Sequence, residues 1–441
     1  MVRCRDRRSR WSTNRFRGHR GLLGRSAVAI RGRSAAFIGV SAALVVAVVA
    51  TIAVAVVSGG DSSRTVTWWL PNWDTEIAQE LLAEFEAENP DLTVQTVETT
   101  VDTMANKISV ALDSGDTPDV ITDLVSRTRT YIRSDQLTDL SGLYGPGMPR
   151  EDFINGALDA VTTDIATYAV PYRWDCISLI YNKDLFAAAG IDGPPATWPE
   201  FIADAQALTT GDAAGVAWPM SGTPNDLVNR FLGFAMSAGA TVEDGVPHLD
   251  VASSQAALEI VGSSVAQGWA SRSSLEVNNT EVRELFINGR VAMYVGGVFD
   301  VELEREAGMN VGTAVTPGPD GPGMQGADGW GYIVPAEAKN VDGAKRLVAF
   351  LSRPDAMARL TSTYPARVSA AAGERFHDED RQAHYEQLTE HSVPTPNDPA
   401  WVSMIPSVYS TIQSVALGES TPAEGARAIQ AEADRLLGPV R

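Results

Sequence analysis

The stretch RTVTWWLPNWDTEIAQELLAEFEAENPDLTVQTV, residues 64–97, sets the fold class of this chain. It opens and closes with β-branched and aromatic runs that are typical of strands. Between them, TEIAQELLAEFEAENP carries apolar residues at helical spacing, with Asp74 or Thr75 placed to begin the helix and an Asn-Pro pair to end it. A helix around 103–115 and a short strand at 119–123 follow. Strands separated by helices predict parallel βαβ units in an open α/β sheet.

The motif WWLPNWD, residues 68–74, places three tryptophans at the carboxyl end of the first expected strand. In open α/β sheets, ligands bind outside the carboxyl ends of the strands. Asp123 is expected at the same edge, where a later strand ends. Strand alternation sends Trp68 and Trp69 to opposite faces, so at least one of them is expected in the core. We therefore expect Trp69 or Trp73 to form a platform for a ligand.

Size and charge limit the classes of protein that the sequence can encode. A chain of 441 residues exceeds what one hydrophobic core usually organises, so two lobes are expected. With 44% apolar and 20% charged residues the chain is globular rather than disordered. The formal charge is -20, and residues 1–33 alone carry eleven arginines and one aspartate. The remainder is strongly acidic and repels phosphate backbones, so no nucleic acid partner is expected.

Residues 34–57 contain no charged side chain and are numerous enough for a helix to cross a bilayer. The arginines before this segment predict a cytoplasmic leader at 1–33, with the chain exported from about Asp61 onward. A cleaved signal peptide is the equally weighted alternative, with small residues near Ser58 that are compatible with cleavage. The leader is then either a cytoplasmic tail or the result of a start codon assigned too early.

The two cysteines, Cys4 and Cys176, lie on opposite sides of this segment. A bilayer between them would prevent a disulfide, and two cysteines are too few for a thiolate metal cage.

Several segments carry a resemblance to a known family. In order they are ENPDLTVQTV, ISVALDSGDTPDVI, VPYRWDCISLIYNKDLFAAAGIDGPPATWPEF, ELFINGRVAMYVGG and GWGYIVPAEAKNVDGAKRLVAFLSRPDAMARL. Together they resemble extracellular solute-binding proteins of ABC sugar importers, the maltose-binding-like family. The resemblance implies a type II periplasmic-binding fold, α/β in class, with two lobes around a cleft and a hinge crossed several times. It places the N-lobe at 61–172 plus 328–372 and the C-lobe at 173–327 plus 373–441. It also implies a monomer that works with membrane permease subunits.

A sugar site needs flat rings for the C–H faces of the sugar and polar groups for its hydroxyl rim. Among the residues expected near the cleft, the rings are Trp69, Trp73, Tyr172, Trp174, Trp330 and Trp401, and the polar side chains are Asn72, Asp123, Arg127, Asp175 and Arg367. Asp175 lies six residues before Tyr181, where the resemblance implies an acidic ligand contact. Arg367 lies in YPARVSA, which resembles a segment that approaches the cleft. Each ring could instead be core, and each acid a cap or an ion-pair partner.

One segment departs from the pattern of the family. Sugar binders of this kind often carry Gly-Pro-Trp after the VAM strand, whereas this chain reads YVGGVFDVE. Val298 takes the tryptophan position and Phe299 follows it, so Phe299 joins the candidate residues. A smaller sugar, or one bound more by the tryptophans of residues 68–73, is therefore expected, so that the ligand is a small sugar or a short oligosaccharide rather than a long maltodextrin.

The sequence gives little support for an enzyme, a metal or a cofactor. GPGMQG, residues 321–326, follows PGPD rather than a strand and is expected to be a loop, not a dinucleotide site. His377, His384 and His391 recur every seven residues in charged surroundings and are expected on a solvated helix face rather than at a metal. The expected function is capture of a carbohydrate for an importer. The alternatives are an anchored sensor with the same fold and a binder of a polyol or a sugar phosphate, for which Arg127 and Arg367 could hold the phosphate.

Overall fold

The computed structural model describes residues 64–154, 156–211 and 213–437. It confirms the βαβ unit that the first motif predicts. Strand β1 (Thr65–Pro71) leads through helix α2 (Thr75–Glu88) to strand β2 (Thr93–Thr99), and the two strands pair in parallel. Apolar residues at helical spacing on α2, Leu81 and Phe85 among them, are buried against the sheet.

A mixed sheet runs through the described chain in the order β2-β1-β3-β10-β4-β8-β5. Strand β11 pairs with β10 and β9 with β4, while β6 and β7 form a separate hairpin. The strands after β2 are β3 (Val120–Leu124), β4 (Ala169–Asn182), β5 (Ala214–Val216), β6 (Thr241–Glu243), β7 (Val246–His248), β8 (Val291–Gly297), β9 (Val311–Ala314), β10 (Gln325–Ile333) and β11 (Ser392–Pro394).

Helices cover both faces of this sheet, as the α/β class requires. The α-helices after α2 are α3 (Val101–Ser114), α4 (Thr128–Arg133), α5 (Lys183–Ala189), α6 (Trp198–Leu208), α7 (Pro224–Ser237), α8 (Val251–Val261), α9 (Ser263–Gln267), α10 (Asn279–Ile287), α11 (Val298–Glu306), α12 (Val341–Leu351), α13 (Pro354–Leu360), α14 (Glu379–Glu390), α15 (Pro399–Ala416) and α16 (Pro422–Leu436). The 3-10 turns are η1 (Val125–Arg127), η2 (Ser141–Leu143), η3 (Arg150–Asp152), η4 (Asp159–Val161), η5 (Arg272–Leu275) and η6 (Glu374–Phe376).

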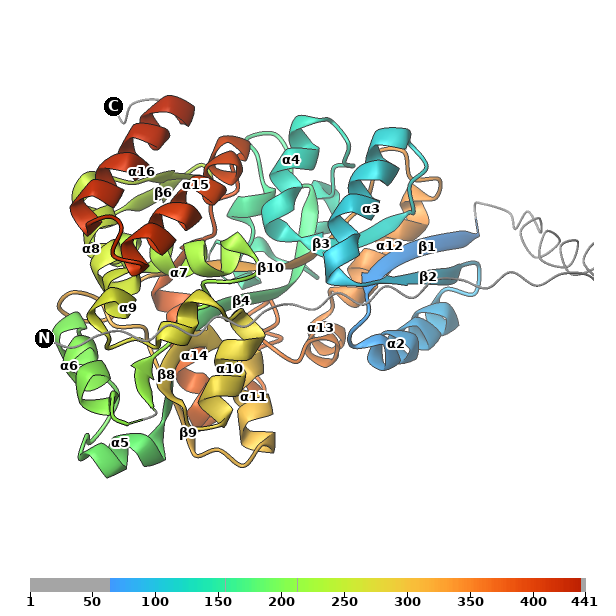
Figure 1. Cartoon of the computed structure of the whole chain (residues 1–441). Coiled ribbons are helices and arrows are strands. Elements are labelled where there is room, and N and C mark those ends of the chain that lie inside the picture. Colours follow the sequence, from blue (N-terminus) through green and yellow to red (C-terminus); the bar gives the residue numbers. More distant parts are fainter. Residues whose placement is uncertain (1–63, 155, 212, 438–441) are drawn as a thin grey trace, which may run out of the picture. The chain divides into compact units, whose positions relative to one another are not determined.

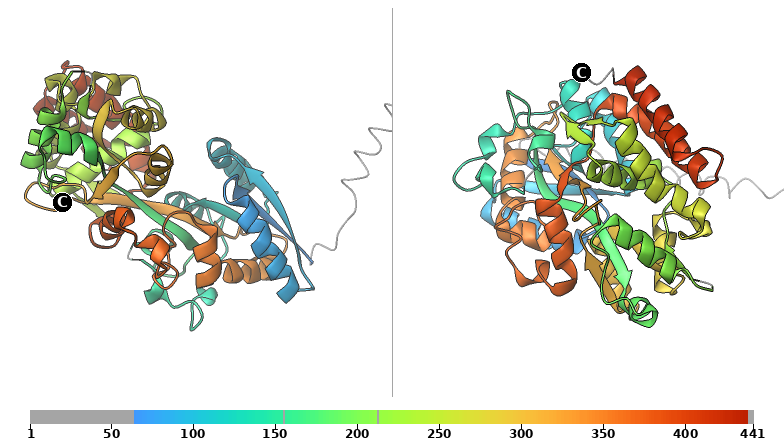
Figure 2. Two further views of the ribbon diagram at one scale, coloured as in Figure 1. Left: turned by 90° about the horizontal axis from the view of Figure 1, so that it is seen from below. Right: turned by 90° about the vertical axis from the view of Figure 1, so that its left-hand side faces the viewer.

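Two main hydrophobic cores define two lobes. The N-lobe core contains Trp68, Phe85 and Tyr332, and the C-lobe core contains Phe201 and Trp218. Figures 1 and 2 show the helices of the two lobes at opposite ends of the long strands β4 and β10, which run between them. Two lobes joined by continuous strands are the arrangement that allows hinge motion around a ligand.

Core membership shows where the chain passes between the lobes. On β4, Cys176 belongs to the N-lobe core and Leu179 to the C-lobe core. Val298 at the start of α11 also packs in the N-lobe core, which takes up the chain again from Ala327 and includes Leu388, whereas Trp401 lies in the C-lobe core. The structure thus changes lobe after Cys176, before Ala327 and after Leu388. The boundaries at 172/173, 327/328 and 372/373 remain predictions from the resemblance.

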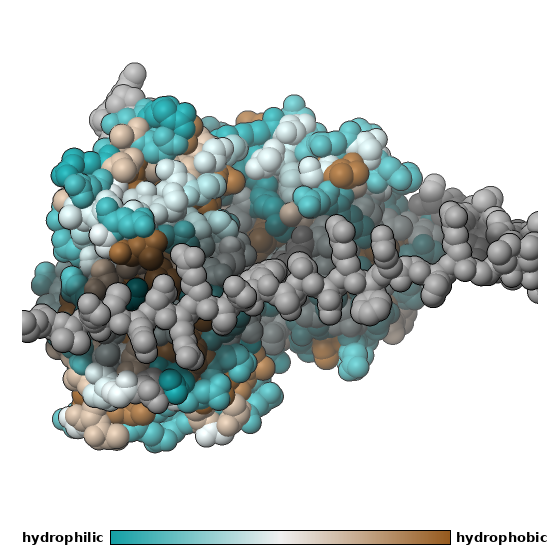
Figure 3. All heavy atoms as spheres, viewed as in Figure 1, coloured by the Kyte–Doolittle hydropathy of each residue, from teal (hydrophilic) through white to brown (hydrophobic). Residues whose placement is uncertain are grey.

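The expected leader 1–33, the apolar segment 34–57 and Cys4 lie outside the described residues. Within the described ranges, no helix is long and apolar enough to cross a membrane. Cys176 is a free, buried thiol. The face seen in Figure 3 is mostly hydrophilic where it is coloured, with hydrophobic residues gathered in a hollow over the C-lobe.

A buried carboxyl group in the C-lobe makes stability depend on pH. Glu304 on α11 is fully buried, accepts a hydrogen bond of 2.5 Å from the hydroxyl of Tyr294 and leaves its second oxygen without a partner among the described residues. Burial raises its pKa from 4.5 to about 8. The folded state therefore holds a proton that the unfolded state releases, so the free energy of unfolding falls as the pH rises from about 4.5 to about 8.

We expect Glu304→Gln to remove this loss because a neutral amide carries no charge to bury. The variant should exceed the wild type in unfolding free energy by an amount on the order of 2 kcal/mol at pH 9, and by much less at pH 5. Urea denaturation at both pH values measures the difference. Glu306→Gln, at an exposed position of the same helix, is the matched control. Equal pH dependence in the wild type and Glu304→Gln would contradict the assignment.

Candidate functional site

The turn after β1 projects the third tryptophan of the motif at the carboxyl edge of the sheet. Asp74 adopts a left-handed backbone conformation with φ of 54°, which turns the chain sharply from β1 into α2. Trp73, just before it, is half-buried and meets Trp330 of β10 edge to face, with ring centroids 4.7 Å apart. This geometry is favourable for aromatic pairs. Asn72 is exposed beside it.

A row of aromatic rings supports this pair from the N-lobe core. Trp68 meets Tyr332 edge to face at 6.1 Å, and Tyr332 stacks on Tyr172 at 4.9 Å with an interplanar angle of 19°. Burial raises the pKa of Tyr172 to about 12, so its hydroxyl stays protonated. Trp73 thus rests on packed rings, which explains why the motif holds so much aromatic surface.

An irregularity between β4 and β10 brings an arginine to the same place. Trp330 pairs with Arg173 and Gly331 pairs with Pro171, so Tyr172 is an extra residue on β4. The bulge lets Tyr172 reach Tyr332 while the next side chain, Arg173, lies 6.0 Å from the ring of Trp73. The close approach of the strands requires a glycine on β10, because a Cβ atom at Gly329 would lie 1.9 Å from the carbonyl oxygen of Arg173.

Two carboxylates flank this arginine. The Nε of Arg173 donates to Oδ2 of Asp175 at 2.6 Å, and the backbone N–H of Tyr364 donates to Oδ1 of Asp175 at 3.4 Å. Burial raises the pKa of Asp74, and the charges of Arg173 and Arg375 oppose that rise. The carboxyl edge of the sheet therefore presents aromatic rings beside hydrogen-bond donors and hydrogen-bond acceptors.

A second acidic group lies on the same edge. Asp328 faces Asp175 in the register of β10 and β4, and it accepts hydrogen bonds from the backbone and hydroxyl of Ser126 at 3.1 and 2.6 Å. Burial raises its pKa to about 6, against these bonds and the charge of Arg127. The loss of hydration on burial therefore outweighs the hydrogen bonds that favour the charged form of Asp328.

The candidate residues Asp123 and Arg127 form an ion pair with each other. The buried carboxylate of Asp123 accepts from Nε of Arg127 at 3.0 and 3.1 Å and from the hydroxyl of Tyr131 at 2.8 Å. Arg127 keeps 27% of its side chain exposed. The pair holds the turn after β3, and Arg127 alone retains access to the solvent.

The start of α11 lies at the junction of the lobes, because the helix directly follows the C-lobe strand β8 while Val298 packs in the N-lobe core. Phe299 and Leu303 lie one turn apart on this helix and are 40% and 43% exposed, whereas Val298 is buried. Phe299 therefore supplies an available ring beside the position at which the family pattern has tryptophan.

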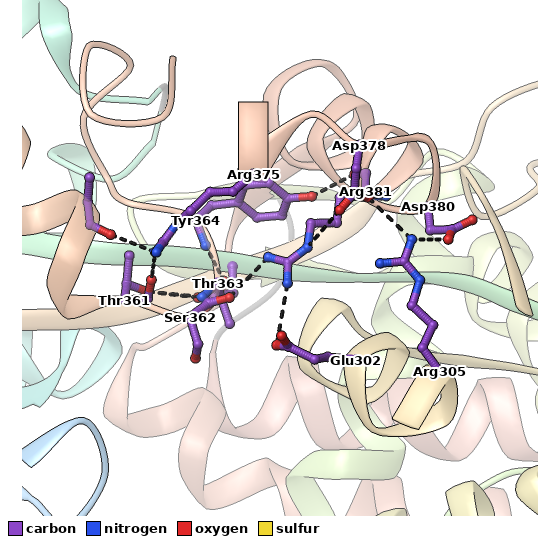
Figure 4. A network of polar contacts seen from close by, with 12 residues as sticks. Glu302, Arg305, Thr361, Ser362, Thr363, Tyr364, Arg375, Asp378, Asp380 and Arg381 are labelled. Carbon is purple, nitrogen blue, oxygen red and sulfur yellow. Dashed lines mark hydrogen bonds and ion pairs between the residues drawn. The ribbon is translucent and has the colours of Figure 1, made fainter. Parts of the chain in front are cut away.

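Figure 4 shows the polar network that joins α11 to the start of α14 and to the segment between α13 and α14. Arg381 donates to Glu302 at 3.4 Å and to the carbonyl of Ser362 at 3.1 Å, and Arg305 pairs with Asp380. Arg375 donates to the carbonyl of Thr361. The network fixes α11 against α14, and α11 also lies beside β4.

Four candidate residues lie away from this edge. Trp69 lies on the other face of β1, where the ammonium of Lys107 from α3 lies 4.0 Å from its ring centroid. Trp174 and Trp401 are each 1% exposed, in the N-lobe and C-lobe cores. Arg367, 4% exposed, donates to Asp152 at 2.7 Å and to the carbonyl of Ser352 at 2.7 Å. Alternation and core packing explain these positions, which favour structural roles for all four.

The structure also adds residues to the site. Arg173 and Asp74 are neighbours of candidates in the sequence, and their signal was the period of two along β4 and the end of the first strand. Arg375 and Arg381 come from a segment whose position no local pattern predicts.

The prediction that the three histidines lie on a solvated helix face is wrong for His384, the middle one. His384 is fully buried in α14, where its Nε2 lies 3.1 Å from the carbonyl of Gly296, and burial lowers its pKa to about 4. His377 precedes α14 and His391 follows it, so the three do not share one solvated helix face. The described residues contain no cluster of His, Cys, Asp and Glu side chains able to hold a metal ion.

A polar pocket of about 610 Å³ lies on the other side of the β4 and β10 strands, between the lobes. Its walls come from α4, η4, the β6–β7 hairpin and the segment after β11, and Figure 1 shows α4 and β6 at the top of the view with α11 and α13 below. Arg129 crosses one side of it by donating to the carbonyl of Asp244 at 3.0 Å. The pocket lacks the tryptophan rings of the group formed by Trp73, Trp330, Arg173 and Asp175, which we call the strand-end site.

Comparison with known proteins agrees with this architecture. Residues 72–358 match the family described as bacterial extracellular solute-binding protein. The chain is 28% identical over 306 residues to an uncharacterised lipoprotein from the oleD 5' region of Streptomyces antibioticus, and the match covers 66% of each chain. It is 22% identical to the maltodextrin-binding protein MdxE of Bacillus subtilis, over 82% of this chain and 88% of the relative.

Among solved structures, the sugar-binding protein MalE of Xanthomonas citri superposes with a TM-score of 0.73 at 25% identity, covering 84% of this chain and 96% of that one. This likeness confirms the type II periplasmic-binding fold. Family membership also confirms that the chain is a binding protein rather than an enzyme. The matched residues span both lobes and most of the strand-end site, and the chain therefore belongs to the bacterial extracellular solute-binding proteins.

Proposed function

We propose that this protein captures a carbohydrate outside the cytoplasm and delivers it to the permease of an ABC importer. The observation that carries the proposal is the Trp73–Trp330 pair beside the Arg173–Asp175 ion pair at the carboxyl edge of the sheet. Rings of this kind pack against the C–H faces of sugars, and charged side chains bond to their hydroxyl groups. A maltodextrin-binding relative and a sugar-binding structural neighbour support the same ligand class.

Capture works through lobe closure. Trp73 packs against the N-lobe core. Phe299 lies on α11, the helix that directly follows the C-lobe strand β8. A sugar that touches both gains contacts in a closed form that the open form lacks, so binding shifts the population toward closure. The permease then recognises the closed form. The protein acts as a monomer at the outer face of the membrane, held by residues 34–57 or released after cleavage there.

Phe299 sets part of the affinity because it is the exposed ring on α11. Phe299→Ala should lower the affinity for the sugar by roughly tenfold, the effect expected for losing one ring contact worth about 1 to 1.5 kcal/mol. Titration calorimetry gives the dissociation constant. Val402→Ala, at an exposed position on α15, should leave it unchanged. An unchanged affinity in Phe299→Ala would remove α11 from the site.

Two alternative functions are a binder of a sugar phosphate and an anchored sensor. For a sugar phosphate the sequence offered Arg127 and Arg367, but Arg127 is paired with Asp123 and Arg367 with Asp152. These pairings weaken the phosphate reading that the sequence left open. An anchored sensor would bind the same sugar and would differ in its partner, a signalling protein in place of a permease.

A thermal-shift screen tests the ligand class. The panel contains mono- and disaccharides, polyols, sugar phosphates and amino acids. A ligand that binds only the folded state adds about 2.7 kcal/mol of stability at a concentration a hundredfold above its dissociation constant. We expect a rise in Tm with neutral sugars. No shift with any sugar, together with a shift from an amino acid or a phosphate compound, would overturn the carbohydrate assignment.

A further inference from the structure

Asp175 is the acidic residue that the family resemblance offers as the ligand contact, yet its carboxylate is already engaged. One oxygen accepts from Nε of Arg173 at 2.6 Å, and the other faces the backbone N–H of Tyr364 at 3.4 Å. The side chain of Asp175 is 18% exposed. The strong, charge-assisted bond to Arg173 would have to be given up or shared before this carboxylate could serve a ligand well.

Arg173 is in the opposite situation. Only its Nε is used, and its two terminal nitrogens donate to no residue that the structure describes. A guanidinium offers five N–H donors in a rigid plane, so most of its donors remain available. The group lies 6.0 Å from the ring of Trp73, and 13% of the side chain is exposed. Unused charged donors beside an aromatic platform favour a ligand with oxygen acceptors.

The charges around Arg173 indicate which acceptors fit. Asp175 is bonded to it, and Asp74 and Arg375 interact with each other across the same space. The charges of the two arginines and the two aspartates sum to zero. An anionic ligand would therefore approach Asp74 and Asp175 without a net positive potential to attract it. A pair of neighbouring hydroxyl oxygens on a neutral sugar can accept from the two terminal nitrogens at no such cost.

We propose that Arg173 is the polar anchor of the solute, that Asp175 is a positioning residue which holds the arginine, and that the group recognised is a neutral vicinal diol. This inference rests on the proposed carbohydrate function and deepens it. It assigns the direct contact to a residue that the sequence patterns did not single out.

Calorimetric titration of the full-length protein in detergent tests the assignment. The neutral probes are glucose, maltose and trehalose, and the charged probes are glucuronate and glucose 6-phosphate. The tightest neutral probe is then titrated into Arg173→Gln, Arg173→Lys, Asp175→Asn, the double variant Arg173→Gln/Asp175→Asn, and Arg359→Gln. Arg359 is a matched arginine on α13 whose partners, Glu80 and Glu84, lie on the outside of α2.

We expect Arg173→Gln and Arg173→Lys to lose at least tenfold in affinity, since neither presents the planar fork. Asp175→Asn should lose threefold or less because its amide oxygen still accepts from Nε. The double variant should bind no more weakly than Arg173→Gln alone, an outcome that a separate ligand contact by Asp175 would not give.

Other results overturn the inference in distinguishable ways. If Asp175→Asn abolishes binding while Arg173→Gln binds as the wild type does, Asp175 is the contact and only the anchor assignment fails. If a charged probe binds the wild type more tightly than every neutral probe, the neutral diol is wrong. If the wild type binds no sugar at all, the carbohydrate function fails together with the inference.

Discussion

We expect Trp73→Ala to lower the affinity for the solute by roughly 50-fold, because truncation of an aromatic anchor at the centre of a site costs about 2 to 3 kcal/mol. The ring is held edge to face against Trp330 at 4.7 Å and lies beside Arg173. Its loss removes the flat surface for the sugar and lets water reach the guanidinium. Titration calorimetry with the best neutral sugar from the thermal screen measures the change.

Trp69→Ala is the matched control, since it removes the same side chain from the other face of the sheet. Its ring packs under Lys107 rather than toward the site, so the affinity should stay within about twofold of the wild type while the Tm falls modestly. The reverse ranking, with Trp69→Ala binding more weakly than Trp73→Ala, would place the site on the α3 side of the sheet.

We expect Arg367→Ala to lower the free energy of unfolding by about 3 kcal/mol, in the range known for removing one partner of a buried ion pair. Arg367 is 4% exposed and bonds to Asp152 and to the carbonyl of Ser352. Its removal leaves these acceptors without their donor. Urea denaturation measures the loss, and the folded fraction should bind the solute with unchanged affinity.

The same substitution at a surface arginine shows whether burial is the cause. Arg359 pairs with Glu80 and Glu84, both well exposed, so Arg359→Ala should cost less than about 1 kcal/mol. A weakened affinity in Arg367→Ala with little loss of stability would instead support the ligand contact that the family resemblance implied for this arginine.

Much of the fold could be predicted because its signals are local. The period of 3.6 in α2 and the β-rich runs on either side of it decide the first βαβ unit, and the parallel pairing of β1 with β2 follows from the crossover between them. The points at which the chain passes between the lobes are harder to predict from the sequence, because β4 is one continuous strand whose two halves belong to different cores. Nothing in the local sequence marks the point between Cys176 and Leu179.

The positions of candidate residues could be predicted where position along a strand decides them. Trp73 and Trp330 lie where the carboxyl-edge rule and the flanking glycines place them. Trp174 and Trp401 are core residues because bulk alone does not distinguish a ligand platform from packing. The position of Arg173 beside Trp73 could not be predicted because it depends on the bulge at Tyr172, which arises from the pairing of β4 with β10.

A crystal structure of the protein with the sugar that gives the greatest thermal shift tests the central claim most directly. The account predicts electron density for the sugar at the carboxyl edge of β1, with one ring face on Trp73, hydroxyl oxygens within hydrogen-bond distance of the terminal nitrogens of Arg173, and Phe299 brought against it by lobe closure. Density for the sugar in the pocket beside Arg129 and Asp244, with the strand-end site filled only by water, would contradict it.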